Sequence, residues 1–284
     1  MDLTSPKTIK VILEKYGAKP SKGLGQNFLV DKNVLNKITE TADIKPNDTV
    51  LEIGPGLGTL TQELAKRAGK VIAVEKDTTM IKILGETLQN YKNVEIIQDD
   101  ILKIHPVIRQ GALSNDRVNY KVVANIPYYL TSPLIRKFLE ADNQPSEMVL
   151  MLQKEVAQRI CAKPPKMSLL AVSVQFYADA KIISYVSKNC FWPAPKIDSA
   201  IIKITPRSQT SHKTVWNPTS HNLFFKIVKA GFSQPRKQLA SNLAKELKID
   251  KEKTALWLEK NNIEPTQRAE TLSIEDWKNL ANSV

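Results

Sequence analysis

The residues of this sequence that could carry out chemistry stand at the ends of short apolar segments. The first group is a glycine-rich turn, Gly54-Pro55-Gly56-Leu57-Gly58, directly after residues 49–53. Glycines let a ligand approach the backbone where a Cβ would block it. Thr59 stands where the dinucleotide pattern G-x-G-x-x-G has its third glycine. The turn therefore predicts a nucleotide-like ligand and fits NAD poorly.

Two acidic residues end the next two apolar segments. Glu75 closes residues 70–75, about 20 positions after Gly54, where a doubly wound fold places a carboxylate on ribose hydroxyls. Asp100 follows residues 94–98 and precedes Ile101, an apolar wall for a ring. We expect Asp100 to accept a hydrogen bond from the exocyclic amine of an adenine. The alternative for each is an ordinary surface acid at the end of a strand.

A fourth apolar segment, residues 120–124, ends in Asn125-Ile126-Pro127-Tyr128. Asn125 offers a carbonyl acceptor, and Pro127 fixes the backbone so that a neighbouring carbonyl can point the same way. Tyr128 offers a flat face for a base. The alternative is a strand-to-helix turn that happens to contain proline.

These features together indicate a cofactor and a reaction. Because the sequence offers no P-loop lysine, the ligand is not expected to be a triphosphate. S-adenosylmethionine fits, since it joins adenosine to an amino-acid tail and a methyl donor. Two carbonyl acceptors would suit an amine such as adenine N6, whose lone pair is delocalised into the ring. Holding its N–H groups would align it for attack on a methyl group, so positioning and electrostatics would do most of the catalysis.

The elements that must position these residues form two predicted domains. Further strand-like segments at 148–152, 181–186 and 198–204 complete a doubly wound α/β fold of seven strands, with helices between them. Beyond residue 206 the pattern is helical, with segments at 223–230, 236–247 and 254–260 and a capping box that opens a last helix at Ser273. We place the domains at 1–205 and 206–284.

Two loops contain residues with an unusual mixture of types. Residues 22–30 combine two glycines, two amides and an apolar end, which indicates an ordered loop that folds over something. Residues 191–199 hold prolines that would present Phe191 or Trp192 on a stiff loop. Core packing is the alternative for either aromatic ring.

Composition limits the partners. The net charge of +12 predicts contact with a polyanion, with solubility as the alternative explanation. Arg236 and Lys237 stand at an expected helix start, where cations oppose the helix dipole, and this favours a phosphate partner. The two cysteines and the scattered His105, His212 and His221 predict no metal site. Without a signal-like segment or an apolar run of about 18 residues, we expect a cytoplasmic protein with no membrane partner. We also expect a monomer.

Several motifs resemble the ribosomal RNA adenine dimethyltransferase family, and the resemblance covers nearly the whole chain. They are Gly25-Gln26-Asn27-Phe28-Leu29, the segment 52–58, Asn125-Ile126-Pro127-Tyr128, and Phe191-Trp192-Pro193-Ala194-Pro195-Lys196-Ile197-Asp198-Ser199. In the tail, residues 231–237, 241–243 and 267–272 are more similar to small-subunit members than to the large-subunit resistance enzymes. The family usually has two arginines before Lys237, whereas Pro235 replaces the first of them here.

The resemblance implies a class I S-adenosylmethionine-dependent, Rossmann-like methyltransferase with a small C-terminal helical domain that recognises RNA. Its expected substrate is a pair of adjacent adenosines in the 3′-terminal hairpin loop of 16S rRNA, dimethylated at N6 during maturation of the 30S subunit. It also implies that Tyr128 and Phe191 enclose the target ring, while Asn125 and the Ile126 carbonyl hold N6. The residues implied to line the cofactor site are Asn27, Leu29, Gly54, Glu75, Asp100 and Asn125. A large-subunit methyltransferase and a non-catalytic RNA-binding assembly factor are the alternatives.

Overall fold

The computed structural model describes residues 1–21, 23–104, 119–207 and 218–284, so that His105 and His212 lie outside the described residues. The chain divides into two compact units. The sheet unit comprises Met1–Ala157 and Lys181–Pro206, and the helical unit comprises Gln158–Ala180 and Arg207–Val284. The predicted division at 205/206 misses one segment, because residues 158–180 belong with the C-terminal helices. Phe176 lies in the same apolar core as Phe224 of the helical unit, and their ring centroids are 4.3 Å apart.

The sheet unit alternates strands and helices along most of its length. Its strands are β1 (Phe28–Leu29), β2 (Thr49–Ile53), β3 (Lys70–Glu75), β4 (Val94–Gln98), β5 (Tyr120–Asn125), β6 (Glu147–Gln153), β7 (Ala178–Val186), β8 (Phe191–Trp192) and β9 (Ser199–Pro206). Its helices are α1 (Pro6–Lys15), α2 (Lys32–Thr41), α3 (Thr59–Ala65), α4 (Thr78–Thr87), α6 (Thr131–Leu139) and α7 (Lys154–Ile160), with short 3₁₀ turns at Tyr128–Leu130 and Lys188–Cys190. The end of α7, residues 158–160, and the start of β7, residues 178–180, belong to the helical unit.

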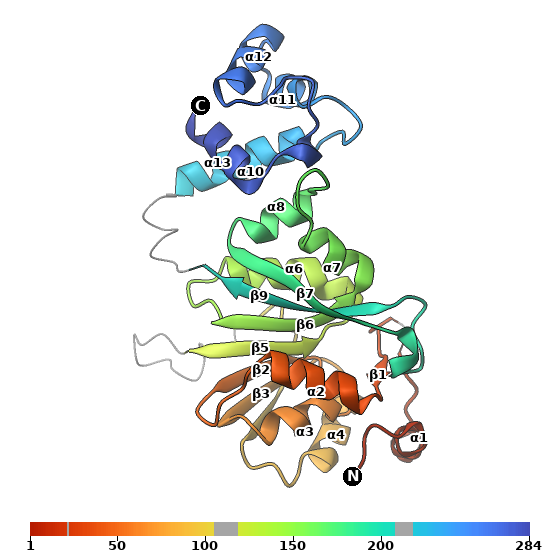
Figure 1. Cartoon of the computed structure of the whole chain (residues 1–284). Coiled ribbons are helices and arrows are strands. Elements are labelled where there is room, and N and C mark those ends of the chain that lie inside the picture. The colour runs from red at the N-terminus through yellow and green to blue at the C-terminus, as the bar shows by residue number, and fades with distance from the viewer. Residues whose placement is uncertain (22, 105–118, 208–217) are drawn as a thin grey trace. The chain divides into compact units, whose positions relative to one another are not determined.

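Seven strands form one sheet in the order β4-β3-β2-β5-β6-β9-β7 (Figure 1). The first five of these run parallel to their neighbours, and β9 pairs antiparallel with β6. The chain builds outward from β2 through β3 to β4, and then β5 pairs with the other side of β2. Doubly wound sheets bind ligands where the strand order reverses in this way, beyond the carboxyl ends of the strands. The predicted doubly wound class is confirmed, and its switch point lies between β2 and β5.

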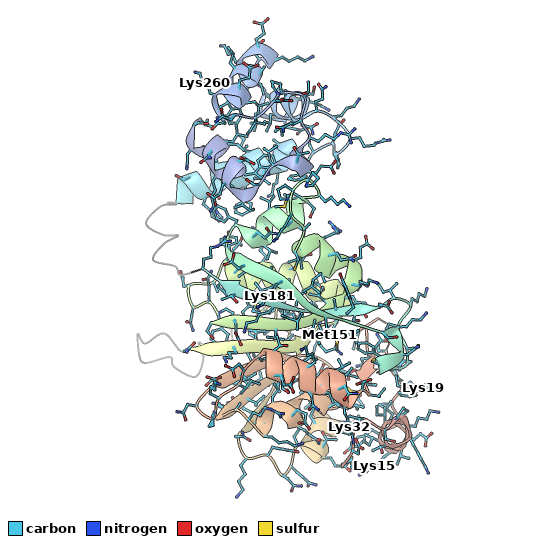
Figure 2. The ribbon with its side chains drawn as sticks, viewed as in Figure 1. Lys15, Lys19, Lys32, Met151, Lys181 and Lys260 are labelled. Carbon is cyan, nitrogen blue, oxygen red and sulfur yellow. The ribbon has the colours of Figure 1, made fainter. Side chains whose placement is uncertain are left out.

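Both faces of the sheet are covered, which explains why its strands are nearly continuous apolar runs. Val50 and Val71 belong to an apolar cluster that also contains Leu35 of α2 and Leu64 of α3. Alternate residues such as Leu51 point to the opposite face and are equally buried. Met151 of β6 is 1% exposed, whereas the lysines labelled in Figure 2 are exposed on the surface.

Side-chain caps define where several helices begin. The Ser5 side chain accepts from Thr8 N at the start of α1, and Asp31 accepts from two backbone amides at the start of α2, and both residue types are favoured at this position. The pairing of β1 with β8 is not predicted. This two-stranded antiparallel ladder joins Phe28 to Trp192 and Leu29 to Phe191.

The helical unit has an apolar core of its own. It contains α8 (Leu169–Gln175), α10 (Pro218–Gly231), α11 (Leu239–Leu247), α12 (Lys251–Lys260) and α13 (Ile274–Asn282), with a 3₁₀ turn at Ala269–Thr271. Trp277 is fully buried in this core, and the predicted capping box joins Ser273 to Asp276. Within the described ranges, no helix has both the length and the apolar character needed to cross a membrane.

The turn before α11 differs from the prediction. The helix begins at Leu239, so Arg236 and Lys237 lie in the preceding turn. Buried Asn242 holds this turn by donating to the carbonyls of Gly231 at 2.7 Å and Gln234 at 3.0 Å. Both cations are consequently exposed on an ordered turn.

Candidate active site

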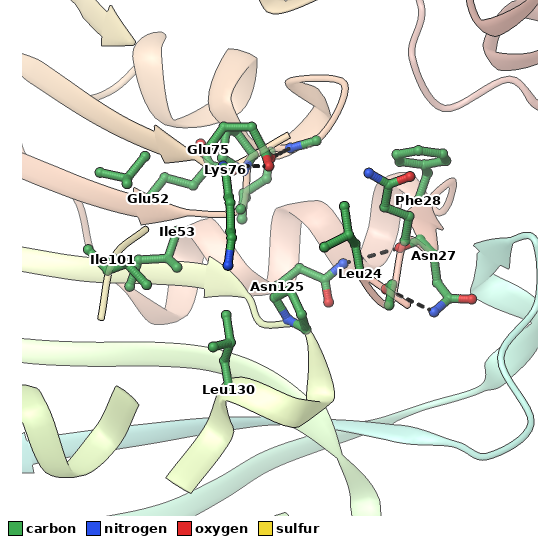
Figure 3. Close-up of a pocket in the computed structure, with 18 of the residues that line it drawn as sticks. Leu24, Asn27, Phe28, Glu52, Ile53, Glu75, Lys76, Ile101, Asn125 and Leu130 are labelled. Carbon is green, nitrogen blue, oxygen red and sulfur yellow. Dashed lines mark hydrogen bonds between the residues drawn. The ribbon is translucent and has the colours of Figure 1, made fainter. Parts of the chain in front are cut away.

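A pocket of about 330 Å³ lies at the carboxyl ends of β2, β3 and β5, where the strand order reverses (Figure 3). Six residues predicted to bind the cofactor line it together: Asn27, Leu29, Gly54, Glu75, Asp100 and Asn125. They come from five segments that are far apart in the sequence. The parallel sheet brings these segments to one edge because equivalent strand ends meet there.

The glycine-rich turn has a backbone that only glycine adopts without strain. Gly54 and Gly56 have φ angles of +66° and +59°. A Cβ on Gly54 would lie 3.5 Å from Pro127 Cδ, and one on Gly56 would lie 3.3 Å from Phe28 Cε1. The turn is thus packed against both the Asn-Ile-Pro-Tyr segment and β1.

Glu75 ends β3 with its carboxylate held by backbone amides. Oε2 accepts from Gly56 N at 3.1 Å, and Oε1 accepts from Lys76 N at 2.8 Å and Asp77 N at 2.9 Å. Burial raises the pKa of this carboxyl, although the three amide bonds lower it. The bond to Gly56 joins the acid to the glycine-rich turn, so both halves of a ribose-binding arrangement are fixed relative to each other.

Asp100 lies beyond β4 and is engaged on both oxygens. Oδ1 accepts from Leu102 N at 3.0 Å, and Oδ2 pairs with the Lys76 ammonium at 3.0 Å. The amide bond and the nearby ammonium lower the pKa of Asp100, which keeps it ionised. Ile101 is 4% exposed and lines the pocket beside it, in the position expected for an apolar wall.

Asn125 ends β5 and faces the loop that contains Asn27 (Figure 3). Its Nδ2 donates to the Asn27 carbonyl at 3.4 Å, and Asn27 Nδ2 donates to the Gly25 carbonyl at 3.1 Å. Because Nδ2 is engaged, Oδ1 is the atom left as an acceptor at the pocket. Pro127 lines the pocket behind Asn125 and packs against the turn that contains Gly54.

The loop before β1 is ordered by its other amide. Gln26 Nε2 donates to Asp77 at 2.8 Å, while Gln26 Oε1 accepts from Ser21 N at 2.8 Å. Asp77 is also the N-cap of α4. The loop is therefore tied to the segment that follows Glu75, in agreement with the prediction that it is ordered.

Tyr128 and Phe191 do not line this pocket. Tyr128 is half-buried, and its hydroxyl shares a hydrogen bond of 3.0 Å with Ser199. Phe191 is 4% exposed and belongs to an apolar cluster that also contains Leu29 and Leu60. In this structure Phe191 occupies a core position, which is the alternative that the sequence left open.

Sequence reasoning missed several residues that line the pocket. Lys76 stands between Glu75 and Asp77, and a cation between two acids could have indicated a place at the pocket. Glu52 lies next to last on β2 and interrupts an apolar run, which was a visible but unused signal. Leu24, from the loop before β1, and Leu130, from the 3₁₀ turn after β5, also line the pocket. No periodic pattern in the sequence predicts that they lie there. Among the described residues, no group of three or more histidines, cysteines or acids could hold a metal ion.

The acceptors of this pocket suit an adenosine that carries an amino-acid tail. Glu75 ends β3 and Asp100 follows β4, apolar side chains flank them, and the lysine that lines the pocket is paired with Asp100. This arrangement on a doubly wound, seven-stranded sheet defines a class I S-adenosylmethionine-dependent methyltransferase.

The chain belongs to the ribosomal RNA adenine dimethylase family, whose model matches residues 17–284. Ribosomal RNA small subunit methyltransferase A from Dehalococcoides mccartyi strain CBDB1 is 48% identical over 271 residues, which are 95% of this chain and 90% of that protein. The protein of the same name from Enterococcus faecalis is 42% identical over 100% of this chain and 96% of its own.

Two solved structures are similar over most of both chains. A dimethyladenosine transferase from Plasmodium falciparum has a TM-score of 0.73 at 28% identity and covers 89% of this chain and 95% of its own. The 23S rRNA methyltransferase ErmE has a TM-score of 0.72 at 26% identity, with 90% and 99% covered. The protein is an S-adenosylmethionine-dependent methyltransferase that acts on ribosomal RNA.

Proposed function

We propose that this protein dimethylates N6 of two adjacent adenosines in the 3′-terminal hairpin loop of 16S rRNA, on the immature 30S subunit. The names of its curated relatives support the small subunit as the target. The observation that carries the chemistry is the Asn125 amide, oriented by Asn27 so that Oδ1 remains an acceptor at the pocket. We further propose that the protein acts in the cytoplasm as a monomer.

In this proposal the cofactor is held by Asn27, Leu29, Gly54, Glu75, Asp100 and Asn125. When bound, S-adenosylmethionine supplies an electrophilic methyl group on a sulfonium. Glu75 would bind the ribose. A carboxylate has about four lone-pair sites, and three backbone amides already use three of them. One hydroxyl can take the remaining site, so a second must share an oxygen with an amide.

Asp100 would accept a hydrogen bond from the adenine amine of the cofactor, and Ile101 would pack against the adenine ring. Its bond to Leu102 N holds Oδ1, and the Lys76 ammonium lies on Oδ2. Lys76 keeps the carboxylate charged and in place. The side chain of Asp100 is 19% exposed, which leaves room for one further donor.

Asn125 would act on the target base. Adenine N6 is a weak nucleophile because its lone pair is delocalised into the ring. An acceptor on one N–H, from Asn125 Oδ1, and another from the Ile126 carbonyl would favour tetrahedral nitrogen and aim its lone pair into the pocket. Pro127 limits the backbone at this point, since its φ is −54°. No strong base is required, because the proton on nitrogen becomes acidic once the methyl group is added.

Tyr128 and Phe191 are proposed to contact the target ring. The half-buried Tyr128 has one bond to Ser199 that fixes its ring. Phe191 is 4% exposed and lies in the short ladder between β1 and β8, so its ring must become more accessible before it can contact a base. An adenosine must in any case leave its stack before N6 can be reached.

We propose that residues 206–284 recognise RNA, together with the segment 158–180 that shares their core. The net charge of +12 supports a phosphate-rich partner. Arg236 and Lys237 are exposed on the turn that Asn242 orders. Such contacts position RNA without reading its bases.

Methyl transfer from labelled S-adenosylmethionine tests the proposal. The protein is incubated with undermethylated small subunits and, in parallel, with large-subunit RNA, and the labelled nucleotides are mapped. We expect label only at two adjacent adenosines near the 3′ end of 16S rRNA. Label confined to large-subunit RNA would contradict the target, and no transfer to either would support an RNA-binding factor without catalysis.

A further inference from the structure

A buried acid at the pocket has no role in the function described above. Glu52 lies next to last on β2 and lines the pocket, although it is only 2% exposed. Its Oε2 has no hydrogen-bond partner in the described part of the chain. The hydroxyl of Thr61 on α3 is fully buried and makes no hydrogen bond of regular geometry there, although it is near enough to Glu52 to affect its pKa. A buried carboxyl oxygen without a partner is costly, so this position needs an explanation.

Among the described residues that line the pocket with Glu52, the ionisable groups are mostly acids. Burial raises the pKa of Glu52 to about 8, the Thr61 hydroxyl lowers it, and the Glu75 carboxylate from β3 raises it. The neutral amide of Asn125, at the end of β5, also lines the pocket. The remaining ionisable groups at the pocket are Asp99, Asp100 and Lys76, and Lys76 is paired with Asp100. Glu52 is therefore protonated at neutral pH unless a positive charge comes close.

We propose that Glu52 loses its proton when the cationic cofactor binds, and that its carboxylate makes the site prefer the charged methyl donor over the neutral demethylated product. The inference rests on the proposed cofactor site. The balance is simple: the Glu52 O–H bond breaks, the proton goes to solvent, and no bond to the cofactor forms. The new carboxylate and the positive charge compensate each other inside the pocket.

The physical reason is the chemistry of a sulfonium. It carries a full positive charge but has no N–H or O–H group. It therefore cannot donate a conventional hydrogen bond to an acceptor of the protein. Charge is what distinguishes it from the thioether of the product. Two opposite charges interact strongly in a poorly hydrated pocket, and a nearby cation favours the ionised form of an acid. Because Glu52 ionises only when the cationic cofactor binds, the site without cofactor contains no unpaired buried charge at this position.

Titration calorimetry tests this inference without any methyl transfer. S-adenosylmethionine and S-adenosylhomocysteine are each titrated in buffers of different ionisation enthalpy, below and above about pH 8, to count the protons released. For the unaltered protein we expect close to one proton released per methyl donor below that pH and fewer for the product. The affinity for the donor should rise by up to about tenfold per pH unit and then level off. In Glu52→Gln this extra proton release should vanish, and the preference for the donor over the product should fall about tenfold.

Two further variants keep the test decisive. Glu147→Gln removes another acid with a buried oxygen that lacks a hydrogen bond. Glu147 lies at the start of β6, at the strand ends opposite the pocket, and is paired with Lys121 and Lys203. This variant should retain the proton release. Thr61→Val removes the hydroxyl that lowers the pKa of Glu52, so the pH range of proton release should move upward.

Equal proton release for donor and product in the unaltered protein would overturn the inference, and so would unchanged release in a folded Glu52→Gln. Should Glu52→Gln fail to fold, an unshifted pH range in Thr61→Val would overturn it. Failure of the unaltered protein to bind either compound would instead contradict the proposed cofactor site itself.

Discussion

The side-chain amide of Asn125 donates to the backbone carbonyl of Asn27, 98 residues earlier, with 3.4 Å between nitrogen and oxygen. This one contact joins the end of β5 to the loop before β1, and it decides which atom of the amide faces the pocket. Asn125 therefore depends on Asn27 for its orientation, and Asn27 is in turn fixed by its bond to the Gly25 carbonyl.

Asn125→Ala should lower kcat/KM for RNA methylation by about 100-fold or more, the usual cost of losing one aligned polar group in a transition state. RNA affinity should stay within about twofold, because Asn125 is not proposed to contact phosphate. Single-turnover methylation and filter binding of RNA measure the two effects. A loss of RNA affinity as large as the loss of rate would show that Asn125 acts in binding.

Glu75→Gln should weaken S-adenosylmethionine binding by about tenfold or more, because a hydrogen bond to a charged acceptor contributes roughly 1.5–3 kcal/mol. Glutamine retains one acceptor oxygen for the turn, so the fold should persist. Calorimetric titration gives the dissociation constant. Glu95→Gln is the control, since Glu95 is an acid on β4 whose side chain is 42% exposed and paired with Lys70. An unchanged dissociation constant in Glu75→Gln would refute the ribose role.

Phe191→Leu separates a contact with the base from core packing. A leucine keeps most of the apolar volume, so the free energy of unfolding should change by less than about 1.5 kcal/mol. If the ring encloses the target base, kcat/KM should still fall about tenfold, the order expected for losing one base–aromatic contact of about 1–3 kcal/mol. Tyr128→Phe, which keeps its ring and loses the bond to Ser199, is the matched comparison. A variant with full activity would leave Phe191 as a core residue only.

Local signals explain why much of the site could be predicted. Gly54, Glu75 and Asn125 each directly follow or end a strand, and parallel strands bring such ends together whatever the details of packing. Caps such as Asp31 are equally local. These features require only neighbouring residues to be interpreted.

The features that were missed depend on contacts between distant segments. β1 and β8 have two residues each, too few for a periodic pattern, so only the folded chain brings Leu29 opposite Phe191. Phe191 is buried in an apolar cluster with residues distant in the sequence, such as Leu29 and Leu60. The apolar helix α8 (Leu169–Gln175), within residues 158–180, could pack on either unit. The aromatic contact of the next residue, Phe176, with Phe224 decides between them. Lys76 pairs with Asp100 across two strand ends, which no local spacing specifies.

Arg236→Ala and Lys237→Ala should each weaken RNA binding and reduce the slope of log affinity against log salt by about one unit or less. The exposed turn that carries them is held by Asn242, so the variants should fold normally. Binding is measured over a range of salt concentrations. Lys45→Ala, which removes an exposed lysine of the sheet unit that is paired with Asp43, is the control and should leave the slope unchanged. Unaltered slopes in the first two variants would mean that these residues do not contact phosphate.

Glu52→Gln should stabilise the protein without cofactor, and the gain should grow with pH. The pKa of this carboxyl is raised from 4.5 to about 8 in the folded state, mainly by burial. Below the pKa of the unfolded state, Glu52 is protonated in both states and its proton does not affect the free energy of unfolding. As pH rises toward about 8, only the unfolded state loses the proton, so folding loses up to roughly 1.4 kcal/mol per pH unit. Glutamine removes this penalty.

Thermal unfolding at about pH 5 and about pH 8 measures the difference. The melting temperatures of the two proteins should be closer at the lower pH, and the variant should be clearly more stable at the higher one. Saturating S-adenosylmethionine should narrow the gap at the higher pH, because binding to the unaltered protein stabilises its native state more. A stability difference that does not depend on pH would mean that Glu52 is ionised in the free protein, and the coupling between its proton and the cofactor would then be wrong.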